Sequence, residues 1–161
     1  MTHTISVLVD NNFGVLSRIS GLFSARGYNI ESLCVGITED PTISRMTVVL
    51  QGDENVVAQI INQLNKLVEV IEVTDLSQAE HVERELVLIK IATNTKRRTE
   101  LLEIANIFRA KVVDVSPKAT ILEATGSAGK IRAFIDMIRP FGIKELARTG
   151  NIALARSANG S

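Results

Sequence analysis

Residues 4–27 read TISVLVDNNFGVLSRISGLFSARG, and this stretch decides the fold. Residues 4–10 alternate apolar and polar side chains, as expected of a strand with one buried face. Residues 13–25 then carry apolar side chains at helical spacing, which places on one face Val15, Leu16, Ile19, Leu22 and Phe23. Gly27 follows the last of these positions, where a helix C-cap glycine belongs. The stretch predicts a strand that leads into an amphipathic helix.

The next fifty residues complete one folding module. Strand-like periodicity returns at 28–37 and 44–50, on either side of a turn signal at Asp40-Pro41. Asp53 is placed to cap a second amphipathic helix, whose apolar positions are Val56, Val57, Ile60, Ile61 and Leu64. A last strand is expected at 67–73. The order β-α-β-β-α-β predicts a ferredoxin-like module, with an antiparallel four-stranded sheet and both helices on one face.

The same order repeats after a polar segment. Residues 77–85 lack an apolar period, which is typical of a linker. Further strands are expected at 86–92, 111–115, 120–124 and 143–154, the last of them interrupted at Thr149-Gly150. Two helix faces lie among them, the second capped by Ser127 and ended by Pro140, with apolar positions at Leu101, Ile104, Ala105, Phe108, Ile131, Phe134, Ile135 and Ile138. We therefore expect an α+β chain of two tandem ferredoxin-like βαββαβ modules, with a first module at 1–76, a linker at 77–85, a second module at 86–157 and a tail at 158–161.

The composition argues against several classes of protein. Of 161 residues 45% are apolar, and 18 Lys and Arg balance 18 Asp and Glu, so no overall field draws the chain to nucleic acid or to an anionic membrane. The local run Lys96-Arg97-Arg98 is interpreted as a solvated helix face, and no run approaches the ~18 apolar residues of a membrane span. The single cysteine, Cys34, cannot form an internal disulfide. Because the N-terminus lacks signal-peptide features, we expect a cytoplasmic protein, with a chain that is already processed as the alternative.

The sequence lacks the residues that other functions of this fold require. The strand at 45–49 has no aromatic side chain to stack on RNA bases, and the loop at 10–14 has no Cys or His to hold a metal. Cys34 is interpreted as a buried, inert thiol, and residues 126–130 as a turn with an N-cap. No paired carboxylates and no nucleophile with its base stand out, so the sequence predicts no catalytic site and a protein that is not an enzyme.

The loop after the first strand is the best candidate for a binding site. Asn11 ends the strand and Gly14 opens the helix, so unpaired helix amides and the helix dipole favour a carboxylate there. Glycine lets a ligand approach the backbone, and an Asn side chain can accept from an ammonium and donate to a carboxylate. The residues alone support two interpretations equally: a tight turn with an Asx cap, and one wall of a pocket for a small amino acid.

These residues also carry a resemblance to a known family. The chain resembles the ACT domain, and more closely the regulatory small subunit of acetolactate synthase (acetohydroxyacid synthase). The motifs that carry it are Asn11-x-x-Gly14-Val15-Leu16-x-Arg18-Ile19, the segment from Leu22 to Leu33, Asp40-Pro41-x-x-Ser44-Arg45-Met46-Thr47, the junction from Val82 to Lys90, Phe108-Arg109-Ala110 and Arg148-Thr149-Gly150. The resemblance covers nearly the whole chain.

The resemblance implies a non-catalytic subunit. Such a subunit binds a large catalytic subunit that carries thiamine diphosphate, FAD and magnesium, raises its activity, and confers feedback inhibition by a branched-chain amino acid, usually valine. No cofactor is implied on this chain. The effector lies between two ACT domains, of which one contributes the first strand–helix loop, here Asn11, Asn12, Phe13, Gly14, Val15 and Leu16, and the other contributes Asn29 and Ile30.

Physical arguments also favour a homodimer. A small module buries a modest fraction of its surface, so pairing with a second copy is expected. The second strand is an edge in ferredoxin-like order, and two copies can pair through it, which brings Asn29 of one chain near Gly14 of the other. Two other functions stay open: a free-standing amino-acid sensor, for example one controlling transcription, and a small enzyme of ferredoxin-like fold. The second module is either a second effector site or a structural arm.

Overall fold

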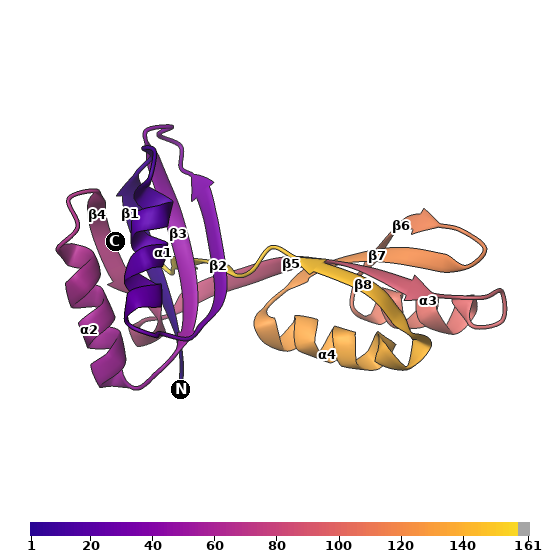
Figure 1. Cartoon of the computed structure of the whole chain (residues 1–161). Coiled ribbons are helices and arrows are strands. Elements are labelled where there is room, and N and C mark those ends of the chain that lie inside the picture. Colours follow the sequence, from indigo (N-terminus) through magenta and orange to yellow (C-terminus); the bar gives the residue numbers. More distant parts are fainter. Residues whose placement is uncertain (158–161) are drawn as a thin grey trace. The chain divides into compact units, whose positions relative to one another are not determined.

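The computed structural model describes residues 1–157, which fold as two compact units. The first unit holds residues 1–82 and the segment that starts at Asn151. Its elements are β1 (Thr2–Asp10), α1 (Val15–Ala25), β2 (Ile30–Ile37), β3 (Ile43–Gln51), α2 (Glu54–Asn65), β4 (Val70–Asp75), the 3-10 turn η1 (Leu76–Gln78) and β9 (Ile152–Ala155). The sheet has the antiparallel order β2-β3-β1-β4, and α1 and α2 lie on one face of it (Figure 1). The expected ferredoxin-like arrangement is confirmed, with β2 at an edge.

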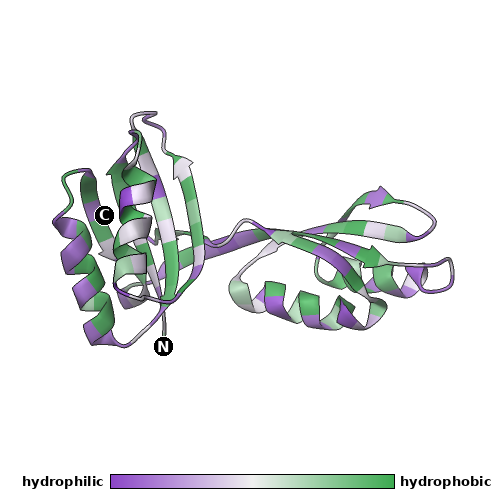
Figure 2. Ribbon diagram, viewed as in Figure 1, coloured by the Kyte–Doolittle hydropathy of each residue, from purple (hydrophilic) through white to green (hydrophobic). Residues whose placement is uncertain are grey.

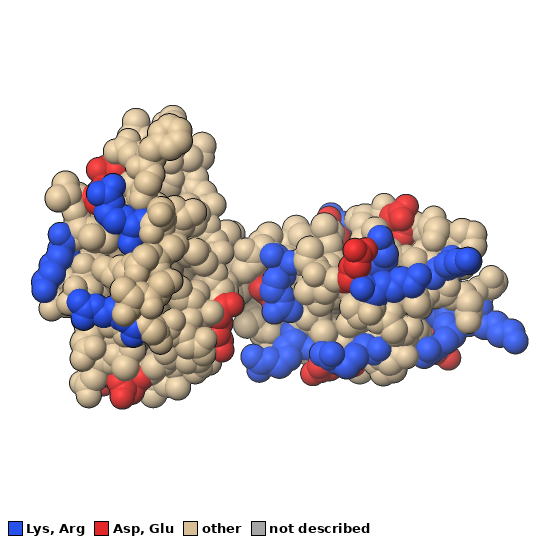
Figure 3. Space-filling view, viewed as in Figure 1, with Lys and Arg blue, Asp and Glu red and all other residues tan. Residues whose placement is uncertain are grey.

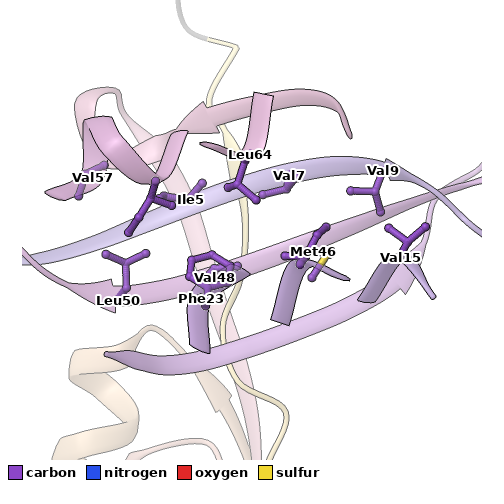
Figure 4. Close-up of a cluster of buried hydrophobic side chains, with 12 residues drawn as sticks. Ile5, Val7, Val9, Val15, Phe23, Met46, Val48, Leu50, Val57 and Leu64 are labelled. Carbon is purple, nitrogen blue, oxygen red and sulfur yellow. The ribbon is translucent and has the colours of Figure 1, made fainter. Parts of the chain in front are cut away.

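The core of the first unit lies between its sheet and its two helices. Alternate side chains of β1 and β3 point toward the helices and meet their apolar faces in one cluster (Figure 4), which includes Ile5, Val7, Val9, Val15, Phe23, Met46, Val48, Leu50, Val57 and Leu64. The predicted helix face of α1 is correct for Val15, Ile19 and Phe23, whereas Leu16 lies at its margin and is 46% exposed. The Asp53 side chain accepts from the Val56 amide at 2.9 Å, which confirms the predicted cap of α2.

The other face of the first sheet is partly covered by segments that were expected elsewhere. The Thr4 amide donates to Ser77 Oγ of η1 at 2.9 Å, and the Asn151 amide donates to Ser32 Oγ at 3.1 Å. The expected strand at 143–154 forms two strands, which confirms the interruption predicted at Thr149-Gly150. It breaks where Gly150 adopts a φ of 81°, and β9 belongs to the first unit rather than to the second module. The physical reason is that no helix covers this face of the sheet, so η1 and the segment around β9 cover it instead.

The expected linker at 77–85 is also more ordered than its composition suggested. Residues 76–78 form η1, and β5 (His81–Ala92) begins well before the expected strand at 86–92. β9 pairs with β5, and the Arg156 amide donates to the Glu80 carbonyl at 2.9 Å. Pairing with a strand from the far end of the chain extends β5, which a local hydrophobic period cannot predict. The expected tail at 158–161 lies outside the described residues.

The second unit, residues 83–150, repeats the fold of the first. Its elements besides β5 are α3 (Arg98–Ile107), β6 (Lys111–Val115), β7 (Ala119–Gly126), α4 (Ala128–Ile138), the 3-10 turn η2 (Arg139–Phe141) and β8 (Ile143–Arg148). The antiparallel order is β6-β7-β5-β8, and both helices again lie on one face. The core is built around Phe134, which is fully buried and packs against Phe108 with ring centroids 5.2 Å apart.

Figure 2 shows hydrophobic and hydrophilic residues interspersed along the helices of both units, and the hydrophobic ones that are buried belong to the core between each sheet and its helices. This is the pattern from which the helix faces were predicted. None of the helices within residues 1–157 combines the length and the apolar composition needed to cross a membrane.

Candidate functional site

The loop between β1 and α1 is tied down by its first residue. The Asn11 amide donates to the Thr42 carbonyl at 2.7 Å, and the Asn11 Nδ2 donates to the Pro41 carbonyl at 3.0 Å. Asn11 therefore holds the loop against the β2–β3 turn and does not cap α1. Of the interpretation as a tight turn with an Asx cap, the cap is wrong, whereas the turn is present, because the Val15 amide donates to the Asn12 carbonyl at 3.5 Å. The interpretation as one wall of a pocket stays a prediction.

The start of α1 is left open instead. Gly14 is the N-cap residue with a φ of 81°, and no side chain accepts from the first turn of the helix. The Arg18 amide bonds to the Gly14 carbonyl at 2.9 Å, so the helical ladder begins there. Backbone amides at such a start carry partial positive charge and need an acceptor from solvent or from a ligand.

Arg18 adds a cation to this position. A Cβ built on Gly14 would meet only the Arg18 Nη2, at 3.8 Å, so the space over the glycine is open and is bordered by a guanidinium. The Arg18 Nη1 forms an ion pair with Glu69 Oε1 at 2.8 Å, and the Arg18 side chain is 56% exposed. This ion pair orients the guanidinium beside the loop and leaves part of it accessible to an anion. Arg18 was not among the site residues expected from the sequence; its position one turn after Gly14 was the available signal.

The other predicted site residues differ in exposure. Phe13 is fully exposed, Asn12 is exposed, and Val15 is 4% exposed because it anchors α1 in the core. Val15 therefore has little to offer a ligand, because its side chain is buried and its amide donates to the Asn12 carbonyl at 3.5 Å. Asn29 is exposed, with its carbonyl accepting from the Gln51 amide at 3.2 Å, and Ile30 is half-buried against the core.

The two halves of the predicted site do not meet within one chain. The sheet register pairs Asp10 with Ile43, so the loop after β1 lies at the end of the sheet where β3 begins. Ile30 pairs with Leu50, near the other end of β3. Asn29 and Ile30 are thus at the opposite end of the sheet from Gly14, and a site that uses both requires two copies of the module.

The edge strand β2 presents an apolar surface next to α1. Leu33 and Val35 pair with the buried Val48 and Met46, so they face the helix side of the sheet, yet they remain 37% and 42% exposed. Ile37 continues this row and is 64% exposed. We call Leu33, Val35 and Ile37 the β2 row. An unpaired edge strand with exposed apolar side chains is typical of an interface.

The remaining candidates are accounted for within the described residues. Cys34 is half-buried rather than buried, because it lies on edge strand β2. His3 is 2% exposed, with its Nδ1 3.5 Å from Asp75 Oδ2. Ser127 caps α4 and the Lys130 Nζ donates to the Thr125 carbonyl at 2.9 Å, which confirms a turn with an N-cap there. Residues 1–157 hold no group of three or more His, Cys, Asp or Glu side chains placed to bind a metal ion.

Comparisons with known proteins cover both modules. Residues 5–72 match the AHAS small subunit-like ACT domain, and residues 84–157 match the small subunit of acetolactate synthase. A probable acetolactate synthase small subunit of Archaeoglobus fulgidus is 54% identical, over 97% of this chain and 98% of its own length. An acetolactate synthase small subunit of Mycobacterium bovis is 46% identical, over 99% of this chain and 95% of its own.

One solved structure is also similar to this chain over nearly its whole length. The crystal structure of the acetolactate synthase small subunit from Thermotoga maritima superposes with a TM-score of 0.88 at 40% sequence identity, covering 97% of this chain and 98% of that one. At this identity and coverage, fold and sequence agree along the chain. The chain belongs to the acetolactate synthase small-subunit family.

Proposed function

We propose that this chain is a non-catalytic regulatory subunit that binds the catalytic large subunit of acetolactate synthase, raises its activity and confers feedback inhibition by valine or a related branched-chain amino acid. Family membership supports the regulatory role. The observation that carries the effector site is the start of α1, where Gly14 is the N-cap and no side chain caps the helix. Thiamine diphosphate, FAD and magnesium are expected on the large subunit.

The chemistry of the loop fits an amino acid. The first-turn amides of α1 that follow Val15 and the nearby Arg18 guanidinium suit a carboxylate, because a charged acceptor at a helix start contributes about 0.3–2 kcal/mol. The ammonium group finds acceptors in the amide side chains of Asn12 and of Asn29 from a second copy. Enclosing a valine side chain adds ~1.5–3 kcal/mol. A micromolar affinity needs about 8 kcal/mol in total, so one open loop is insufficient and a second wall is required.

A second copy supplies that wall if two β2 strands pair antiparallel. β2 runs over Ile30–Ile37, and an antiparallel pair centred on Cys34 places Leu33 of one copy opposite Val35 of the other, so that both stay on the helix side of the sheet and the start of one β2 lies beside the end of the other. Ile37 lies beside the end of the sheet that carries the Asn11–Gly14 loop, since it pairs with Ser44. The same pairing covers the β2 row. The effector site and the homodimer are therefore one proposal.

Regulation then follows from a shift in population. Valine bound between two modules stabilises the arrangement it fits, and it shifts the enzyme only by the difference between its affinities for the two arrangements. We assign the less activating arrangement to the valine complex. The large subunit performs the chemistry in either case.

The substitution Gly14→Asp tests the site. It places a carboxylate in the open space over the helix start, where it competes with the carboxylate of the effector, and the structure leaves room for the added Cβ. We expect loss of valine inhibition with activation retained, measured by titrating the reconstituted enzyme with valine.

Gly14→Asn is the matched control. Asn has the same shape as Asp and also tolerates the positive φ at this position, but it carries no charge. Valine inhibition should be weakened less by Gly14→Asn than by Gly14→Asp. Inhibition that survives Gly14→Asp unchanged contradicts the assignment of the site.

A further inference from the structure

Charge is divided unequally between the two units, although the whole chain is neutral. The first unit contains five Lys and Arg against ten Asp and Glu, whereas the second contains thirteen against eight. The net charges are therefore about −5 and +5, equal and opposite. Figure 3 shows Lys and Arg side chains gathered over the second unit on the face drawn. Neutrality of the whole chain conceals a strongly basic module.

Part of this charge is concentrated at one end of the second sheet. Three connections meet there: the β5–α3 loop, the β6–β7 turn, and η2 after α4. Backbone hydrogen bonds join them, because the Thr93 amide donates to the Lys118 carbonyl at 3.0 Å and the Ala92 amide donates to the Gly142 carbonyl at 2.8 Å. Each connection carries a cation, and together we call them the cationic end: Lys96, Arg97, Arg98, Lys118 and Arg139.

Two arginines of the cationic end are structural. The Arg98 Nη2 donates to the Ser116 carbonyl at 2.9 Å, and the Arg97 Nη1 donates to the Pro140 carbonyl at 3.3 Å. The Arg97 guanidinium also lies 4.3 Å from the centre of the Phe141 ring. These contacts fix the three connections to one another. They show that Lys96-Arg97-Arg98 is more than the solvated helix face expected from the sequence.

The remaining cations are exposed: Lys96, Lys118 and Arg139. Arg139 has a loose ion pair with Asp136, with the Nη2 and Oδ1 atoms 3.7 Å apart and both side chains about two-thirds exposed. Within residues 1–157 neither Lys96 nor Lys118 forms an ion pair. Exposed cations on connections that are fixed in this way attract an anionic partner from solution.

This end is not a second copy of the effector loop. The α3 start corresponds to the α1 start, but its N-cap is Arg97 with an ordinary helical φ of −93°, and the Arg97 amide already donates to Asn94 Oδ1 at 2.9 Å. No glycine opens the backbone there. A small amino acid therefore finds no equivalent of the Gly14 site, and of the two roles left open for the second module the effector site is disfavoured.

The residues of the cationic end fit an acidic protein surface better than they fit single-stranded nucleic acid or a small phosphate. Single-stranded nucleic acid is bound by exposed aromatic rings, whereas Phe141 is 8% exposed and covered by Arg97. A small phosphate needs guanidinium groups that are free to converge on it, and those of Arg97 and Arg98 already donate to carbonyls. Spread, exposed lysines suit the rim of a protein interface, where complementary charge sets the association rate and the orientation.

We propose that the cationic end of the second module docks on an acidic surface of the catalytic large subunit. The inference rests on the proposed function, because it names the surface through which that partner is first captured. It assigns capture of the large subunit to the second module and effector binding to the first.

Charge reversal tests the proposal. In one variant Lys96, Lys118 and Arg139 are all changed to Glu. In the matched control Arg84, Arg132 and Arg148 of the same unit are changed to Glu, which alters the net charge equally but away from the cationic end. The association rate with the purified large subunit is measured by surface plasmon resonance at about 0.05 M and about 1 M salt, where the screening lengths are roughly 14 and 3 Å.

The first variant should associate at least about tenfold more slowly than the unmodified chain at low salt, and the difference should largely vanish at high salt. The control should stay within about threefold of the unmodified chain. Equal effects of the two variants, or an effect of the first that is independent of salt, would overturn the proposal. Binding of duplex DNA that the first variant loses, with unchanged association to the large subunit, would assign the surface to nucleic acid instead. An unmodified chain that neither binds nor activates the large subunit contradicts the proposed function itself, so the two failures are distinguishable.

Discussion

A substitution in the β2 row can disrupt the proposed homodimer without unfolding the module. Val35 lies in the middle of the edge strand and is 42% exposed, so Val35→Asp leaves the core of the module intact. In the paired arrangement the same position is buried against a second copy. We expect Val35→Asp to produce a folded monomer that no longer binds valine.

The free energy that the β2 row contributes to the dimer follows from the exposed fractions of its side chains. Leu33, Val35 and Ile37 retain 37%, 42% and 64% of their surface, and burying one such side chain completely contributes ~1.5–3 kcal/mol. Covering the row on both copies therefore contributes about 4–9 kcal/mol. Val35→Asp removes about a third of this and buries two carboxylates without partners, each costing on the order of 1–3 kcal/mol or more. A combined loss of at least about 3 kcal/mol weakens the dimer roughly 100-fold.

Sedimentation analysis measures the dimer, and isothermal titration with valine measures the site. Ile71→Asp is the control, because Ile71 is 52% exposed on β4 at the opposite edge of the same sheet. It should leave both the mass and the valine affinity unchanged. A Val35→Asp protein that remains dimeric, or a monomeric one that binds valine normally, would show that β2 does not form the interface that completes the site.

Three further predictions concern stability and charge. Asp53→Ala removes the cap that accepts from the Val56 amide and should destabilise the first unit by about 1 kcal/mol in thermal unfolding, while an unchanged melting temperature would show that the cap contributes nothing. Phe134→Ala empties the centre of the second core and should lower the free energy of unfolding in urea by about 3–5 kcal/mol, and a loss below about 1 kcal/mol would contradict the packing described. The hydrogen bond and charge of Glu145 raise the pKa of Lys90 above its usual 10.5, and Lys90 lowers the pKa of Glu145 below 4.5. The stabilisation from Lys90 is therefore lost as pH rises through its raised pKa, and that from Glu145 is lost as pH falls through its lowered pKa. NMR titration of Glu145→Gln should find the Lys90 pKa nearer 10.5, and an unshifted Lys90 would rule out this pairing.

The parts of the fold that depend on local pattern were predictable from the sequence. Residues 4–27 form the expected strand and helix because alternation and helical periodicity are both properties of neighbouring residues. The caps at Asp53 and Ser127 follow from residue type and position alone. Both βαββαβ orders therefore follow from the pattern of side chains along the chain.

The parts that depend on distant pairing were not predictable. β5 begins at His81 in a polar stretch because it pairs with β9, which lies some seventy residues further along the chain. The Asn11 side chain reaches Pro41 rather than the helix start, and Arg18 lies over Gly14. Net charge likewise conceals the difference between the two units, because the charges cancel only over the whole chain.

We propose that valine binds between two copies of the first module and poorly to one. Isothermal titration of valine into the purified chain tests it when performed at chain concentrations above and below the dimer dissociation constant, with the mass determined by sedimentation in the same samples. We expect one valine per chain in the dimer, because the two loops are equivalent, and a large loss of affinity where the chain is monomeric. Equal affinity for monomer and dimer, or no heat of binding to the dimer, would contradict it.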